Sequence, residues 1–155
     1  MSGEHRLAEV ELDAATLPAA TAEIEHERRV AVFDLVEANA FRPVDAPGGP
    51  YRLVLSLLDS RLVFDVSGPG YQRAHGLSLT PLKTVLKDYL LICDSYYEAL
   101  RGSSPSQIEA VDMGRRGLHN EGAELLKARL DGKIEIDHET ARRLFTLVTA
   151  LYRRG

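Results

Sequence analysis

One short segment of this chain concentrates the side chains that could do chemistry. It reads DMGRRGLHNEGAE and ends at Glu124. If the segment is helical, residues four positions apart share a face. One row then starts at Asp112 and includes Arg116, and Arg115 and His119 lie beside it. Arginine binds carboxylates and phosphates through paired hydrogen bonds, and histidine can titrate near neutral pH. The predicted anion- or partner-binding site comprises Asp112, Arg115, Arg116, His119, Asn120, Glu121 and Glu124.

Three glycines interrupt the same segment and leave a second interpretation open. A glycine inside a helix costs roughly 1 kcal/mol relative to alanine, but it lets another backbone or a ligand approach closely. Gly114, Gly117 and Gly122 therefore fit either a docking patch or an ion-pair ladder on a tightly packed helix. The spacing favours neither. Catalysis is less favoured than both, because no Ser-His-Asp set follows from spacing, and we assign no catalytic residue.

A second polar cluster lies near the N-terminus. Glu23, His26 and Glu27 would share one face of a helix and could hold a divalent metal. No second histidine lies four residues away, so the zinc-protease pattern is lacking. Acidic residues in a first helical turn are also expected from the helix dipole. We therefore predict neither a metal nor a cofactor.

Two arginine pairs in the last helix raise the question of nucleic acid. Arg142-Arg143 and Arg153-Arg154 are eleven residues apart, close to three helical turns, and could contact phosphates. Aromatic residues make up only 6% of the chain, which offers no stacking platform. The net charge of −4 also repels nucleic acid on average, although residues 101–155 carry +2 against −6 for residues 1–100. Nucleic-acid binding is our third hypothesis.

The totals describe an ordinary globular chain. Its 155 residues suit a single domain spanning 1–155, with 45% hydrophobic and 27% charged residues. Cys93 is the one cysteine, so a disulfide within the chain and a cysteine zinc site are excluded and a reducing compartment is favoured. The N-terminus lacks the apolar stretch of a signal peptide, and no apolar run reaches the length of a membrane helix. We expect a cytoplasmic protein without membrane contact.

The elements that must position these residues differ between the two halves. The N-terminal half predicts strands, together with a helix that follows Thr21, runs to about Asn39 and places Ile24, Val30, Phe33 and Val36 in the core. A loop is predicted over 41–50. The first strand alternates, with Ala8 among its core residues. The predicted strands, the last three of which form an antiparallel meander, are 6–13, 51–58, 61–67 and 74–79.

The C-terminal half predicts three helices. Thr80 and Pro81 fit the start of one that stops at Gly102, and Ser104 with Gln107 fits a capping box for the next, through Leu130. A last helix follows over 137–152. The helix over 81–102 is apolar around much of its circumference. Such a helix is central or covered by a second subunit.

Several stretches resemble an uncharacterised family of alphaproteobacterial proteins, whose genes often lie beside that for histidinol dehydrogenase. The resemblance spans nearly the whole chain. It implies a bacterial cytosolic setting and brings no activity, cofactor or site residue with it. The stretches that carry it are EIEHER, GGPYRL, RLVFD, LSLTP, SPSQIEAVDMGRRGLHNEG and TARRLFTL.

Together these observations predict an α+β fold, in which a small antiparallel meander of three or four strands is covered by about four helices, mainly C-terminal. The leading functional hypothesis is a non-catalytic regulatory or protein-interaction module that forms a homodimer and could also bind another protein. The alternative is an enzyme or binding protein for an anionic ligand, phosphorylated or carboxylate, around Arg115, Arg116, His119 and Glu121.

Overall fold

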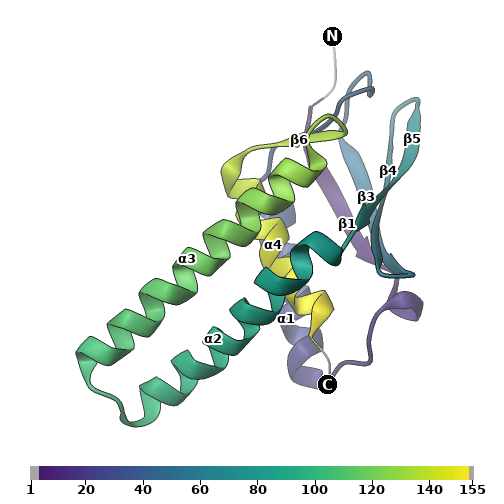
Figure 1. The fold of residues 1–155 in the computed structure, drawn as a ribbon. Helices are drawn as coiled ribbons and strands as arrows, with labels where there is room; N and C mark the ends of the chain where they lie inside the picture. The colour runs from purple at the N-terminus through teal and green to yellow at the C-terminus, as the bar shows by residue number, and fades with distance from the viewer. Residues whose placement is uncertain (1–3, 154–155) are drawn as a thin grey trace.

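The computed structural model describes residues 4–153 and has the predicted α+β fold, with the helices mostly in the C-terminal half. Figure 1 shows the strands gathered on one side and the helices on the other. The strands are β1 (Leu7–Leu12), β2 (Phe41–Pro43), β3 (Tyr51–Leu58), β4 (Arg61–Gly68), β5 (Tyr71–Ser78) and β6 (Ile134–Ile136). The main helices are α1 (Ala22–Glu37), α2 (Lys83–Gly102), α3 (Pro105–Leu130) and α4 (His138–Tyr152).

The main sheet has the strand order β1-β3-β4-β5, and its last three strands form the predicted antiparallel meander. Strand β1 lies at the edge and pairs with β3 in parallel. A parallel pair needs a crossover connection, which helix α1 supplies here. The prediction for Ala8 was wrong, because the register shifts between Leu7 and Glu9 and leaves Ala8 exposed.

Two short strands were missed by the sequence analysis. Residues 41–50 were expected to form only a loop, but β2 pairs antiparallel with β6 from the far end of the chain. Phe41 and Ile136 are partners in this pair, and both are buried. Three-residue strands are too short to show an alternating pattern, and their pairing depends on a contact almost a hundred residues away. Strand β5 also begins at Tyr71, three residues before its predicted start.

Helix α1 turns a different face to the core from the one predicted. Ile24 is buried as expected, but Phe33 is 65% exposed and Val30 is 44% exposed. The buried face includes Arg28, whose guanidinium donates to the carbonyl oxygens of Ala150 and Pro18 at 3.3 and 3.1 Å. These hydrogen bonds satisfy a buried charged group. The buried residues of this helix are Ile24, Arg28, Ala31 and Leu35.

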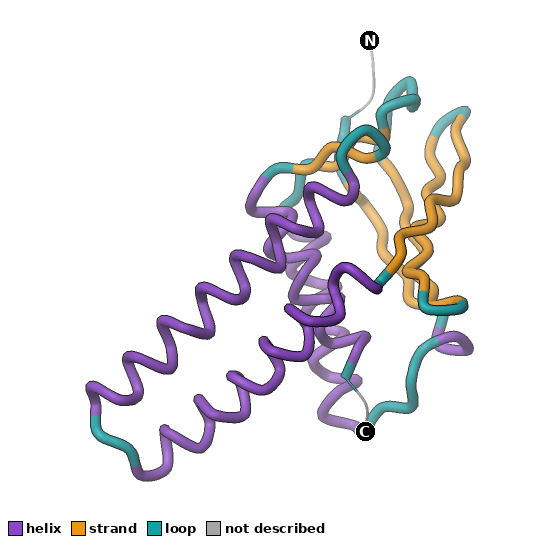
Figure 2. Tube along the Cα trace, in the orientation of Figure 1, coloured by secondary structure: helices purple, strands orange, loops and turns teal. Residues whose placement is uncertain are grey.

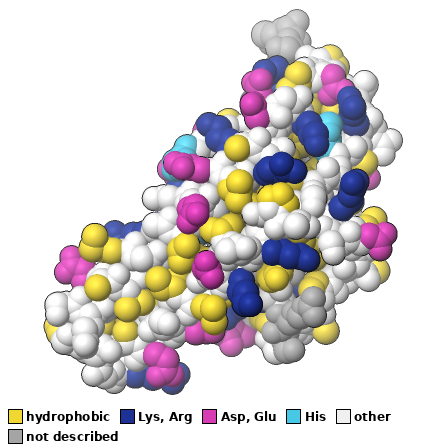
Figure 3. All heavy atoms as spheres, in the orientation of Figure 1, with side chains coloured by type: hydrophobic (Ala, Val, Ile, Leu, Met, Phe, Trp, Pro, Cys, Tyr) yellow, Lys and Arg dark blue, Asp and Glu magenta, His cyan; other side chains and the backbone are white. Residues whose placement is uncertain are grey.

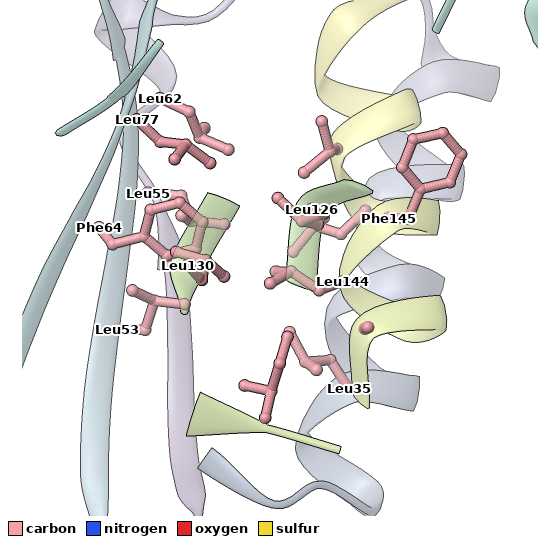
Figure 4. Packing of buried hydrophobic residues seen from close by; sticks show 14 of the residues in the cluster. Leu35, Leu53, Leu55, Leu62, Phe64, Leu77, Leu126, Leu130, Leu144 and Phe145 are labelled. Atoms are coloured by element: carbon pink, nitrogen blue, oxygen red, sulfur yellow. The ribbon is translucent and has the colours of Figure 1, made fainter. Parts of the chain in front are cut away.

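The hydrophobic core lies between one face of the sheet and the helices. In Figure 4, leucine side chains of the strands point toward side chains of α1, α3 and α4. The predicted inward positions are confirmed for Leu53 and Leu55 of β3 and for His75 and Leu77 of β5. Alternate residues of these strands are partly or fully exposed, as expected for an antiparallel sheet with one solvated face.

Helices α2 and α3 form an antiparallel hairpin, here called the arm (residues 83–130). Figures 1 and 2 show the arm projecting away from the sheet, with its connecting loop at the free end. Ser104 and Gln107 form the predicted capping box at the start of α3. The predicted cap at Thr80 was wrong: a 3-10 turn over Thr80–Leu82 leads into α2, with no side-chain cap. Within residues 4–153, no helix is long and apolar enough to cross a membrane.

Asn39 offers a test of how the edge strand is attached. Its side chain accepts from the backbone N–H of Leu7 (2.7 Å) and donates to the carbonyls of Leu7 (3.0 Å) and Leu35 (2.8 Å). We expect Asn39→Ala to lower the free energy of unfolding by about 2–3 kcal/mol, because partly buried backbone groups lose their partner. Urea denaturation measures this change.

Gln72→Ala is the control, because Gln72 is exposed on β5, and a surface change of this kind costs less than about 0.5 kcal/mol. A loss at Asn39 no larger than the loss at Gln72 would show that the amide does not hold β1 in place.

Candidate functional site

The predicted segment is one uninterrupted stretch of α3, in the middle of the arm. One side of this stretch packs against α2 and another against α4. The three glycines do not break the helix, so the four-residue spacing assumed from the sequence holds. The individual side chains nevertheless separate into groups with different environments.

Asp112 forms ion pairs with both arginines of the segment. Its Oδ1 accepts from Arg115 Nε at 3.1 Å and Nη2 at 2.5 Å, and its Oδ2 accepts from Arg116 Nε at 2.9 Å. The guanidinium of Arg115 also lies 4.9 Å from the ring centroid of Tyr96 on α2. The hydrogen bonds from Arg115 and then Arg116 lower the pKa of the Asp112 carboxyl. This group is an ion-pair ladder that ties α3 to α2 through a cation–π contact.

His119 is buried where the arm packs against α4. Its Nε2 is 2.8 Å from the hydroxyl of Thr146, and its ring meets those of Tyr89 and Phe145 edge-on at 5.4 and 5.2 Å. Burial, followed by the nearby charges of Arg142 and Arg115, lowers its pKa to about 4. The imidazole is therefore neutral at pH 7. Its Nδ1 is buried without a hydrogen-bond partner among the described residues.

The glycines separate into close-packed and open positions. A Cβ on Gly122 would overlap the ring of Phe145 on α4, and one on Gly114 would lie 2.7 Å from Cδ1 of Ile92 on α2. A Cβ on Gly117 would meet nothing within 4 Å. Two of the three glycines thus allow neighbouring helices to approach closely, as the packing interpretation expects.

The remaining predicted residues lie on the outside of α3. Asn120 accepts a hydrogen bond from Arg142 of α4, and Glu121 and Glu124 are exposed. The seven predicted residues therefore do not converge on one point. The geometry favours the ion-pair ladder on a glycine-packed helix, and the anion site remains a prediction.

A groove between α1, α2 and α4 was not expected from the sequence. It has a volume of about 410 Å³, and Tyr89, Cys93 and Thr146 are among its lining residues. At the groove, Nη1 of Arg153 donates to both carboxylate oxygens of Glu27, with both distances 2.7 Å. The signal was present in the sequence of α2, as a second apolar row that contains Cys93 beside the row that meets α3.

The side chains that line the groove between α1, α2 and α4 are not activated for acid–base or nucleophilic chemistry. Burial raises the pKa of the Cys93 thiol, which keeps it protonated at neutral pH. Burial and the neighbouring Cys93 raise the pKa of Tyr89 to about 12. Glu27, considered above as a metal ligand, is instead paired with Arg153. Among residues 4–153, no three His, Cys, Asp or Glu side chains are grouped closely enough to hold a metal ion. Arg154 lies outside the described residues.

Fold and segment together define an α+β protein with a projecting two-helix arm that is held by an internal ion-pair ladder. The chain belongs to the uncharacterised protein family UPF0262, whose model matches residues 4–154. It is 58% identical to the UPF0262 protein of Caulobacter vibrioides over 151 residues, which are 97% of this chain and 95% of the relative. It is 59% identical to the one of Rhizobium johnstonii over 155 residues, 99% and 98% of the two chains.

These relatives confirm the resemblance to an alphaproteobacterial family of unknown function. A third relative, from Phenylobacterium zucineum, is 58% identical over 152 residues, covering 98% of this chain and 96% of its own. No solved structure matches the chain at a significant level.

Gly122 and Gly117 form a matched pair for testing the packing interpretation. We expect Gly122→Ala to lower the free energy of unfolding by about 2 kcal/mol, because the new methyl group overlaps the Phe145 ring. Gly117→Ala should raise it by up to about 1 kcal/mol, because alanine favours the helix and meets open space there. Thermal and urea denaturation of both variants measure the difference. Equal stabilisation by both changes would contradict the close approach.

His119 predicts a specific loss of stability in acid. Its pKa of about 4 in the folded state lies below the ordinary value of 6.5, so the unfolded chain binds more protons between these values. Its contribution is therefore fully present above pH 6.5 and is lost as the pH falls toward 4. The loss is on the order of 3 kcal/mol.

The free energy of unfolding, measured from pH 7 to pH 4, should fall less steeply for His119→Gln than for the unchanged protein. Both proteins contain His75, whose pKa burial also lowers, so the difference between the two slopes reports His119 alone. Parallel curves would mean that the His119 imidazole is as readily protonated in the folded as in the unfolded chain.

Proposed function

We propose that this protein is a non-catalytic interaction module that pairs with a second copy of itself through the arm. The observation that carries the proposal is an apolar row on α2 that the rest of the described chain covers only in part. We call this row the outer stripe. It consists of Leu90, Cys93, Tyr97 and Leu100.

The outer stripe has the spacing of a coiled-coil seam. Together with the buried Leu86, its members recur at intervals of four and three residues, which keeps them on one side of the helix. A parallel row, one residue earlier in the sequence, includes Ile92 and Tyr96 and faces α3. Helix α2 therefore carries two adjacent seams, and α3 occupies one of them.

Exposure along the outer stripe increases toward the free end of the arm. Leu90 and Cys93 are half-buried beside α1 and α4, whereas Tyr97 is 58% exposed and Leu100 is 52% exposed. The face of the molecule seen in Figure 3 carries further hydrophobic side chains along the arm, among charged ones. Leaving such residues in water forgoes the free energy that burial would provide, so a covering partner is expected.

A second copy suits the stripe better than an unrelated helix. Two arms related by a two-fold axis would present the same row to each other, so one surface is its own complement. The 20 residues of α2 span about 30 Å, which gives each arm room for a seam of several turns. Two hairpins packed in this way form a four-helix bundle, a stable arrangement for helices with apolar stripes.

The state of the polar groups supports a binding role over catalysis. His119 is neutral and enclosed, both arginines of the segment are bonded to Asp112, and burial raises the pKa of the Cys93 thiol. In this proposal the segment from Asp112 to Glu124 stiffens the arm. A free thiol in the outer stripe also fits a reducing compartment, and we propose the cytoplasm.

The test is the mass of the protein in solution by light scattering. The unchanged protein should be a dimer at micromolar concentration, and Tyr97→Glu combined with Leu100→Glu should make it a monomer, because the charges cannot be buried unpaired. Leu91→Glu is the matched control: Leu91 is 57% exposed on the opposite side of α2. The control variant should remain a dimer.

A monomeric unchanged protein at 100 micromolar would overturn the proposal. Loss of the dimer in Leu91→Glu, with the stripe variant unaffected, would overturn the assignment of the seam. Circular dichroism of all variants keeps the result interpretable, since the changed residues are exposed and the fold should be retained.

A further inference from the structure

Strand β1 leaves one edge of the main sheet unpaired. It is the first strand in the order β1-β3-β4-β5, and no strand of residues 4–153 lies on its other side (Figure 1). At its start, the side chain of Asn39 bonds to both backbone groups of Leu7. The open edge therefore begins after Leu7 and ends at Leu12. This length matches a short peptide in extended conformation.

The backbone groups of two residues face outward along this edge. Asp13 donates its backbone N–H to the carbonyl of Leu55 on β3 at 2.9 Å. In a parallel ladder, alternate residues turn both their N–H and their C=O toward the partner strand. The backbone groups of Glu9 and Glu11 therefore also face β3. The N–H and C=O groups of Val10 and Leu12 consequently point away from the sheet, where an added strand would bond to them.

An apolar groove lies directly beside the open edge. It has a volume of about 630 Å³ and runs between β1 and the outer side of α1. Val10 and Leu12 contribute from the strand, and Val32, Phe33 and Val36 contribute from the helix. Phe33 is the side chain whose exposure contradicted the sequence prediction. A strand added beside β1 would place every second side chain against this part of α1.

The opposite face of the edge is acidic. Glu9 and Glu11 alternate with the groove-facing residues and both bond to the single guanidinium of Arg52. Two carboxylates against one guanidinium leave an excess negative charge. A second copy of β1 is therefore a poor occupant, because antiparallel pairing would place these glutamates opposite the glutamates of the other copy, and their like charges would repel. A strand with lysine or arginine at those positions would complement them.

We propose that the groove between α1 and β1 binds an extended segment of another protein, which adds to β1 as a fifth strand. The segment carries apolar residues toward Val32 and Phe33 and basic residues toward Glu9 and Glu11. Main-chain hydrogen bonds supply affinity, and the alternating side chains supply specificity. This site is separate from the arm, so it stands or fails independently of self-association.

The experiment uses a fluorescein-labelled hexapeptide of alternating lysine and valine with blocked ends, and the full chain at low salt. Fluorescence anisotropy should show saturable binding, at least about fivefold tighter than for the matching peptide of glutamate and valine. Two variants locate the site. Val10→Pro removes an outward N–H without touching the bonds to β3, and Phe33→Ala removes the exposed ring. Each should weaken binding about fivefold.

Leu58→Ala is the control, because Leu58 is 49% exposed at the end of β3, beyond the residues that pair with β1 and outside the groove. This variant should bind the peptide as the unchanged protein does. If Val10→Pro lowers the melting temperature by many degrees, peptide binding by Phe33→Ala alone tests the site, because the Phe33 side chain is at the surface and its removal should leave the fold intact. Equal binding of the two peptides, or unchanged binding by Phe33→Ala, would overturn the proposal. Conversion of a dimer into a monomer by Val10→Pro would instead assign the edge to a second copy.

Discussion

Gly122 and Phe145 meet where α3 crosses α4, and the placement of the arm depends on this contact. The ring occupies the space of the missing side chain, so the two helices lie closer than larger residues would allow. Next to it, His119 reaches Thr146 across the same helix pair. Phe145 also belongs to the core beneath the sheet. This close approach therefore connects the hairpin to the core, together with buried residues at the base of the hairpin such as Leu86 and Leu126.

The ion pairs farther along the arm have a different role. Asp112 gathers two guanidinium groups, and Arg115 in turn covers the ring of Tyr96. Exposed ion pairs contribute little to stability individually, but a shared carboxylate restricts several side chains together. The surface of α3 is thereby ordered at a point where α4 no longer covers it. A rigid element is a better presenter of a binding surface than a flexible one, because less conformational entropy is lost on association.

The sequence predicted elements whose signals are local. The capping box at Ser104 lies within four residues, and the apolar spacing of α2 extends over five turns. The pairing of β2 with β6 and the buried face of α1 could not be predicted in this way. Both depend on partners from the other end of the chain: Ile136 for Phe41, and the carbonyl of Ala150 for Arg28. For the candidate site, the spacing correctly grouped Asp112 with Arg116, but whether His119 pointed outward was decided by α4.

The packing of α1 against α4 has a consequence for how the chain is made. These are the first and the last α-helices among residues 4–153, and Arg28 bonds to the carbonyl of Ala150. At about 5–20 residues per second, a ribosome needs on the order of 10 s to extend the chain from one helix to the other. During that interval α1 has no α4 to cover it. The covered face of α1 is thus open to chaperones until α4 has been synthesised.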